Sequence, residues 1–259
     1  MKFIEFNIQM QQTSNKKLYI YLPKYWKNQV VNMKNESARK LIIEMPCFSM
    51  LTEEQNLIVQ NSSHIISYDA GEVLFRQDTP VSHIMYLQSG LIKIFSEGRN
   101  DRSIIFDLAT SGSFIALMTV FGEDLYQYNA AVVDHSQVVL TDMSVLRKLI
   151  LENGEFASFL LKQTSKEGLN ITTKFMKQFQ KQLPGRVAEM LLFFSEKIYK
   201  SHTFNLPLSR KELAEFTGTT KESMIRTLAE FRHDKIIRLE GKKVEIISPD
   251  IIHTLSRLG

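Results

Sequence analysis

The sequence predicts an α+β protein: an antiparallel, jelly-roll-like β-roll, then one long helix, then a small domain of helices and a β-hairpin. Short alternating strands recur about every ten residues over 41–150. A proline-free segment over 154–182 favours one continuous helix. Further on, two helix-start patterns precede two strands that flank Gly241. The chain therefore divides into an N-terminal extension (1–40), the β-roll (41–150), the long helix (151–183) and the C-terminal domain (184–259).

The strands expected in the β-roll are short and are separated by glycine turns or polar loops. They are expected at 64–68, 71–75, 84–87, 91–95, 103–107 and 137–140. Strands at this spacing are typical of a compact barrel or jelly roll, in which alternate residues face the interior. The sequence therefore predicts an antiparallel, jelly-roll-like β-roll over 41–150.

The long helix carries apolar side chains for which the sequence offers no other cover. Gly168 is the one interruption in its interior, and the apolar residues do not keep a strict heptad. Periodicity alone therefore does not predict a coiled coil. An uncovered apolar face is typical of an interaction site, although a simple linker between domains is the alternative.

Two helix starts and a glycine mark a tight turn near the C-terminus. Ser209 with Glu212, and Thr219 with Glu222, have the spacing of a capping box, in which a hydroxyl and a carboxylate bind free backbone amides. Gly218 lies where the first helix must end, because glycine adopts the left-handed conformation without a steric penalty. We predict a helix-turn-helix here.

The second of these helices has an apolar face and a charged face. Met224 and Leu228 share one side, whereas Glu222 and Arg226 share the other and Ile225 lies at its edge. An arginine fork binds guanine, a carboxylate accepts from cytosine and an aliphatic group contacts the thymine methyl, so these three residues suit base edges in a major groove. The alternative is that Glu222 and Arg226 form a surface ion pair between successive turns.

Polar residues around the start of the same helix suit phosphate contacts, because free amides and the helix dipole attract anions there. The residues expected to hold phosphates are Arg210, Thr219, Thr220, Lys221 and Ser223.

The distribution of charge along the chain also indicates a nucleic-acid partner. Residues 41–150 hold six lysines or arginines against 13 acidic residues, whereas 162–259 hold 18 against 11. The basic part is expected to face a polyanion.

Three stretches resemble the CRP/FNR family of bacterial transcription regulators. The run Lys221-Glu222-Ser223-Met224-Ile225-Arg226 is similar to the family's recognition helix, and 183–192 is similar to its hinge. Residues 69–75 and 86–93 resemble strand motifs of the family's cyclic-nucleotide-binding β-roll. The resemblance implies a winged helix-turn-helix, a sensor role for the β-roll and a protein that is not an enzyme.

The resemblance also implies partners: a palindromic double-stranded DNA operator, a second copy of the chain, RNA polymerase and an unknown small-molecule effector. It makes 151–183 the dimerisation helix. The contacts expected there are Phe156, Phe159, Leu160, Met176 and Phe179. A rival interpretation, a regulatory subunit that binds ligand without touching DNA, is disfavoured by the basic C-terminal domain.

The effector pocket departs from the family's nucleotide-binding pattern. Leu117 stands where a ribose-binding Glu is expected, and Tyr128 stands where a phosphate-binding Arg is expected. No lysine or arginine occurs from Ser103 to Val145, and a buried phosphate without a cation is costly. The residues of this degenerate pocket are Gly112, Phe114, Leu117, Tyr128, Asn129, Ile171 and Thr172. We expect an effector other than cyclic AMP, or none.

No cofactor or metal is expected. The six histidines show no close metal-binding spacing, although a haem-based gas or redox sensor remains the alternative, with His83 and His135 as candidate ligands. A metal-dependent oxygenase would need clustered histidines and a carboxylate, which the strands do not provide. The single cysteine, Cys47, excludes an intrachain disulfide and a four-thiolate iron–sulfur cluster.

The compartment is expected to be the cytoplasm, with no membrane partner. No apolar run reaches the about 20 residues of a membrane helix, and the first residues lack the apolar core of a signal peptide. Residues 1–40 lie outside the resemblance. Our hypothesis is that translation starts at Met33 and that 1–32 are a start-site artefact or a basic arm.

Overall fold

The computed structural model describes residues 48–98 and 103–259. The N-terminal extension, Met33 and Cys47 lie outside the described residues. The β-roll and its helices come first: α2 (Glu53–Asn61), β1 (Ser63–Tyr68), β2 (Val73–Phe75), β3 (His83–Glu97), β4 (Ser103–Thr110), β5 (Ser113–Ile115), α3 (Leu117–Gly122), β6 (Asn129–Asp142) and α4 (Met143–Glu152). The fold class predicted from the sequence is confirmed.

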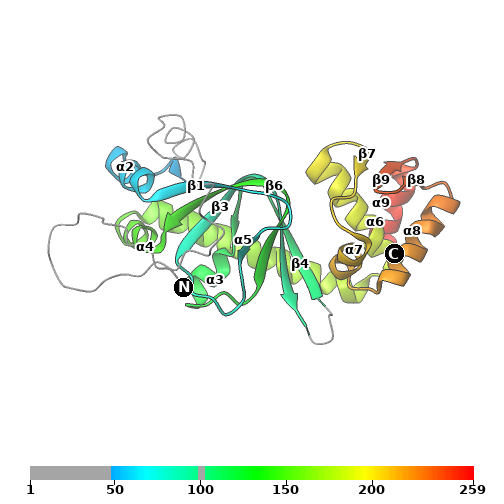
Figure 1. Cartoon of the computed structure of the whole chain (residues 1–259), viewed down its shortest axis with the longest axis horizontal. Coiled ribbons are helices and arrows are strands. Elements are labelled where there is room, and N and C mark those ends of the chain that lie inside the picture. The colour runs from blue at the N-terminus through cyan, green and yellow to red at the C-terminus, as the bar shows by residue number, and fades with distance from the viewer. Residues whose placement is uncertain (1–47, 99–102) are drawn as a thin grey trace.

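The second half is mainly helical. Helix α5 runs along the β-roll and joins it to the C-terminal domain (Figure 1). The elements are α5 (Gly154–Gln180), α6 (Leu183–Leu192), the π-helical η4 (Phe193–Tyr199), β7 (Thr203–Asn205), α7 (Arg210–Thr217), α8 (Lys221–His233), β8 (Ile237–Glu240), β9 (Lys243–Ile246) and α9 (Pro249–Leu258).

The sheet of the β-roll is antiparallel and has the order β1-β6-β3-β4, with β2 paired to β6 and β5 to β3. Strands β3 and β6 are long and pair with each other along most of their length. The strands expected at 84–87 and 91–95 are therefore one strand, which bends at Gly90. Strand β6 starts before the strand expected at 137–140, because the register with β3 continues to Asn129.

The bend in β3 depends on glycine. Gly90 has φ +107°, a conformation that side-chain-bearing residues rarely adopt. The Ser136 hydroxyl of β6 sits against it, accepts from the Leu91 amide at 3.2 Å and donates to the Asp134 carbonyl at 2.6 Å. The two long strands thus cross closely at this point.

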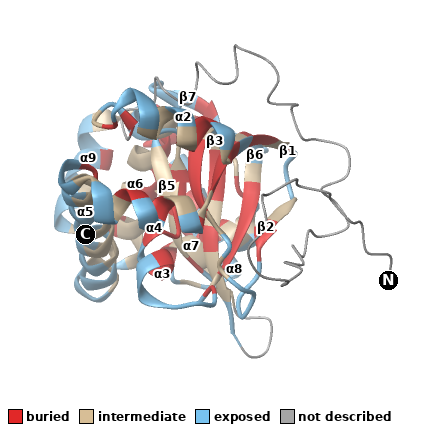
Figure 2. Cartoon of the chain, turned by 90° about the vertical axis from the view of Figure 1, so that its left-hand side faces the viewer, coloured by how far each residue is buried: buried red, intermediate tan, exposed pale blue. Residues whose placement is uncertain are grey.

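Buried apolar side chains fill the roll and a second layer between the roll and helices α2, α4 and α5. The strands of the roll carry most of its buried residues, whereas the helices present an exposed side (Figure 2). Phe156 and Leu160, at the start of α5, are 0% and 1% exposed and belong to the second layer. The prediction that they lie on an uncovered dimerisation face is therefore wrong. Phe159 is also half-buried against the same cluster.

The helix-turn-helix forms much as predicted. The Ser209 and Glu212 capping box begins α7, and Gly218 ends it with φ +66°. The second capping box is wrong: Thr220, not Thr219, caps α8 and accepts from the Ser223 amide, so Glu222 does not occupy the third helical position. Strands β8 and β9 form the antiparallel hairpin expected around Gly241.

Candidate nucleic-acid interface and effector region

Helix α8 presents the charged face that the sequence predicts. Met224 and Leu228 are buried in the C-terminal domain, whereas Glu222, Ile225 and Arg226 are exposed. Among residues 48–98 and 103–259, neither Glu222 nor Arg226 has an ion-pair partner. The alternative of a surface ion pair is thus not realised. Both side chains are available for contacts outside the chain.

The first turn of α8 has fewer available polar groups than expected. The Thr220 hydroxyl lies 3.1 Å from the Ser223 hydroxyl and also caps the helix, so these two side chains satisfy each other in part. Thr219 is half-buried, and its amide donates to Ala214 in the turn. Lys221 is exposed and charged.

Arg210 has a structural contact that the sequence did not indicate. Its guanidinium donates to the Gly241 carbonyl at the tip of the β8–β9 hairpin at 2.7 Å. Partial burial lowers the pKa of Arg210 from its ordinary value. Arg210 therefore joins α7 to the hairpin, in addition to any phosphate contact.

The C-terminal domain packs against the β-roll through α7. Leu91, Ile105 and Leu108 of the roll share one buried cluster with the side chains of the C-terminal domain. The Lys93 ammonium of β3 donates to the Glu212 carboxylate of α7 at 2.5 Å. Burial raises the pKa of Glu212, but hydrogen bonds from Lys93 and Ser209 outweigh it and hold that pKa below its ordinary value.

Charged side chains connect the end of α5 to α6. Arg186 donates to the carbonyls of Gln178 and Lys181 at 3.0 Å each, which satisfies backbone acceptors at the end of α5. Lys177 and Lys181 both pair with Glu189 of α6. Sequence analysis identified the hinge region from a resemblance but missed these contacts, since no spacing signal links Glu189 to its two lysines.

The residues of the degenerate effector pocket are only partly brought together. Leu117 is 1% exposed and belongs to the apolar core, and the side-chain oxygen of the buried Asn129 accepts from the Gln77 backbone N–H at 3.0 Å. Phe114 packs edge-on against Tyr86. Gly112 occupies a turn with φ +89°. These side chains serve the structure of the roll.

Tyr128 lies in an aromatic group with Phe106 and Phe75, at ring distances of 5.1 and 6.2 Å. Burial, above all, raises the pKa of Tyr128 to about 12, so it is a neutral phenol at physiological pH. Of the residues expected from α5, Ile171 is half-buried and Thr172 is exposed, with its hydroxyl turned back to the Gly168 carbonyl.

Glu167 is a residue that sequence analysis missed. It is half-buried on α5, close to Met118 at the start of α3. Burial and the nearby Asp107 of β4 raise the pKa of Glu167 to about 7. Asp107 in turn pairs with Lys174, which lies further along α5. Two carboxylates, those of Asp107 and Glu167, thus lie near each other in this part of the roll.

The histidines are dispersed. His135 pairs with Asp69 on the surface at 3.1 Å, and His83 shares a 2.8 Å hydrogen bond with Ser82. Burial lowers the pKa of His83. In the part of the chain that the structure describes, no group of three potential metal ligands is found. Of the helices described there, none is long and apolar enough to cross a membrane.

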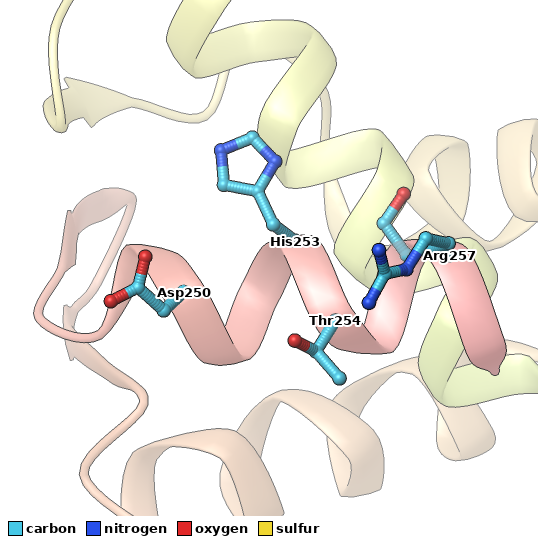
Figure 3. Close-up of a pocket in the computed structure, with 5 residues that line it drawn as sticks. Asp250, His253, Thr254 and Arg257 are labelled. Carbon is cyan, nitrogen blue, oxygen red and sulfur yellow. The ribbon is translucent and has the colours of Figure 1, made fainter.

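An open groove of about 540 Å³ runs along α9 (Figure 3). Its lining residues are Asp250, His253, Thr254, Ser256 and Arg257. The four labelled side chains fan out from the helix, and His253 lies 3.2 Å from the Glu196 carboxylate. A ligand site needs polar groups that converge on one point, and this groove does not provide that arrangement.

Comparison with known proteins agrees with this geometry. Residues 185–252 match the Crp-like helix-turn-helix domain, and 65–153 match the cyclic nucleotide-binding domain. The chain belongs to the CRP/FNR family of bacterial transcription regulators. It is therefore a DNA-binding transcription regulator and not an enzyme. The sequence-based identification and the winged helix-turn-helix are confirmed.

Individual relatives are distant. The chain is 23% identical over 185 residues to the CRP-like cAMP-activated global transcriptional regulator of Mycobacterium tuberculosis, with 70% of this chain and 83% of the relative covered. It is 24% identical over 183 residues to the transcriptional activator protein Anr of Pseudomonas protegens, with 69% and 75% covered.

Solved structures share the fold. FixK2 from Bradyrhizobium japonicum matches with a TM-score of 0.68 and 20% identity over 74% of this chain and 96% of that one. The c-di-GMP responsive regulator CLP of Xanthomonas campestris matches with a TM-score of 0.64 and 22% identity over 75% and 99%. CRP/FNR relatives are thus described with different effectors, so family membership does not fix the effector of this chain.

Proposed function

We propose that this regulator acts as a homodimer in the cytoplasm and reads a palindromic operator through α8, with Glu222, Ile225 and Arg226 at base edges. The observation that carries the proposal is the exposed face of α8, where both charged side chains lack an ion-pair partner among the described residues. Lys221 contacts phosphate beside it. As a regulator of promoters, the protein also contacts RNA polymerase.

The second copy is proposed to bind along one stripe of α5. Residues 161, 165, 168, 172, 175 and 179 are spaced alternately by four and three, which is the seam of a coiled coil. Leu161, Phe175 and Phe179 in this stripe are 69%, 61% and 76% exposed, and Ser165, Gly168 and Thr172 between them are small. Small residues allow two helices to approach closely. The buried Phe156 and Leu160 hide this heptad when the whole helix is considered.

Selection of duplexes from a random library tests the operator proposal. We expect the full-length protein to enrich a two-fold palindrome whose half-sites lie about one helical turn apart. Enrichment of a single, asymmetric half-site, or no enrichment above the basic affinity for any DNA, would contradict the dimeric arrangement.

The effector is proposed to differ from cyclic AMP, because the stretch of the roll from Ser103 to Val145 holds no lysine or arginine to pair with a phosphate. Leu117 and Tyr128 replace the family's binding groups, and the carboxylates of Asp107 and Glu167 lie near each other. We expect calorimetric titration with cyclic AMP to show no saturable binding at micromolar concentration. Tight binding with one nucleotide per chain would overturn this part of the proposal, and would mean that backbone amides neutralise the phosphate.

A further inference from the structure

One face of α7, the first helix of the helix-turn-helix, lies against the β-roll and α5. The Lys93 ammonium of β3 is 2.5 Å from the Glu212 carboxylate, and the Lys174 ammonium of α5 is 5.9 Å from the ring of Phe216. Glu212 and Phe216 are four residues apart, so they share one side of the helix. Both contacts thus act on the same side of α7.

Lys93 is held in its place by the sheet of the roll. It lies opposite Leu108 in the β3–β4 register, and Leu108 belongs to the buried cluster that the roll shares with the C-terminal domain. The side chains of Lys93 and Glu212 are only 20% and 27% exposed. An ion pair that is largely removed from water is screened little, and the loss of one partner leaves the other buried and unpaired. The pair therefore adds a directional contact to an apolar interface.

The Glu212 carboxylate connects this contact to the backbone of α7. Its Oε1 atom accepts from Lys93, whereas its Oε2 atom accepts from the Ser209 amide at 2.8 Å in the capping box that begins the helix. The carboxylate cannot turn away without breaking the cap. Lys93 therefore contacts α7 through a group that the backbone holds in place.

The C-terminal domain is also attached at the end of α5, where Lys177 and Lys181 pair with Glu189 of α6. A single attachment leaves a domain free to rotate about it. A second contact, on a different helix, prevents that rotation. Helix α8 follows α7 through the turn at Gly218 and packs in the same core, so the pair of Lys93 with Glu212 fixes the direction of α8 relative to α5.

The docked side of α7 leaves the base-reading face of α8 free, because Glu222, Ile225 and Arg226 are exposed. The contact therefore orients α8 and does not cover it. We propose that Lys93 of the β-roll is a positioning residue for operator reading. Through Glu212 it fixes the angle between α8 and α5, and in the dimer it thereby sets the spacing of the two half-sites. The inference rests on the proposed dimeric reading of a palindrome.

Operators with altered half-site spacing test the positioning role in the full-length protein. Wild type should bind the selected spacing far more tightly than spacings two base pairs longer or shorter, which rotate one half-site by about 70° relative to the other. Lys93→Glu places a second carboxylate beside Glu212. It should lose about tenfold on the selected operator and bind the three spacings almost equally, because the correct angle is then populated only part of the time.

Two variants show whether the cation itself is needed. Lys93→Arg keeps the charge and should restore the wild-type preference for spacing. Lys148→Glu makes the same change of charge on α4, at the other end of the β-roll from α7 (Figure 1), and should also keep it. A duplex with a single half-site should bind wild type and Lys93→Glu equally, since one α8 needs no fixed angle. A wild-type spacing preference in Lys93→Glu would overturn the inference.

Distances between spin labels test the orientation without DNA. Labels are placed on cysteines substituted for the exposed Ala70 of the roll and Ala229 of α8, in a Cys47→Ser background. Labelled chains are diluted with unlabelled protein so that each dimer carries one labelled chain. The distance distribution should be narrow in wild type and broad in Lys93→Glu.

Lys93→Met removes the cation but keeps an apolar stem, so it should broaden the distribution even if Lys93→Glu folds poorly. An equally narrow distribution in Lys93→Met and wild type would overturn the inference, whatever the protein reads on DNA. A wild type that shows no preference for spacing, together with a distribution that broadens in Lys93→Met, would instead contradict the proposed palindrome and leave the orienting role of Lys93 supported.

Discussion

A Phe179→Asp variant is expected to be a monomer that no longer binds its operator tightly. Phe179 is 76% exposed on α5, and its ring lies edge-on to that of Phe175 with centroids 4.8 Å apart. In a two-fold dimer each substitution occurs twice, and two aspartates would face each other across the seam. Burying them without a partner should raise the dimer dissociation constant by at least about 100-fold.

In this variant the sedimentation coefficient should fall to that of a monomer, and the affinity for the operator should fall with it. Phe175→Asp should behave in the same way. Thr173→Asp adds the same charge to an exposed position of α5 outside the stripe and is the control. A dimer of unaltered strength in both phenylalanine variants would show that the second copy binds elsewhere.

A Gly90→Ala variant is expected to lose about 3 kcal/mol or more of folding free energy, because glycine is needed there for two separate reasons. Its φ of +107° strains any side-chain-bearing residue, and an added Cβ would lie 2.1 Å from the Ser136 hydroxyl oxygen and 2.6 Å from the His135 carbonyl oxygen. Backbone atoms of β6 cannot move aside without breaking the β3–β6 pairing. The unfolding midpoint should fall by about 5–10 °C.

Alanine substitutions at two other glycines distinguish the backbone penalty from the steric clash. Gly71 also has a positive φ, of +91°, but an added Cβ there would meet nothing within 4 Å, so Gly71→Ala should show the backbone penalty alone. Gly122 has neither constraint and should tolerate alanine. If Gly90→Ala is no worse than Gly71→Ala, the close crossing of β3 and β6 contributes little.

Sequence analysis succeeded where the signal is local. The Ser209 cap, the Gly218 stop and the opposite faces of α8 depend on residues within a few positions of one another, and the structure confirms them. Thr219 and Thr220 both carry a hydroxyl that could cap α8, and sequence analysis predicted the wrong one, Thr219. Local spacing could not distinguish them, because the choice depends on how tightly the turn after Gly218 closes.

The errors share a different cause, which is contact between distant segments. Phe156 and Leu160 are apolar at helical spacing, but only the folded chain shows that α2 and α4 cover them. Glu167 has no motif around it, since the neighbours that influence its pKa, Met118 and Asp107, come from other elements. Arg210 was expected at a phosphate, whereas the fold brings the hairpin tip to it. Side chains that act through tertiary partners leave no periodic signal.

The central claim is that α8 reads base sequence, and paired binding measurements on Arg226→Ala and Lys221→Ala test it most directly. Affinities are measured for the selected operator and a scrambled duplex over a series of salt concentrations. Arg226→Ala should lose about 1–3 kcal/mol on the operator and little on the scrambled duplex, because its guanidinium is proposed to bind a base edge. Lys221→Ala should lose the same on both duplexes and reduce the salt slope by about one, as a phosphate contact does. Equal losses of Arg226→Ala on the two duplexes would contradict the claim.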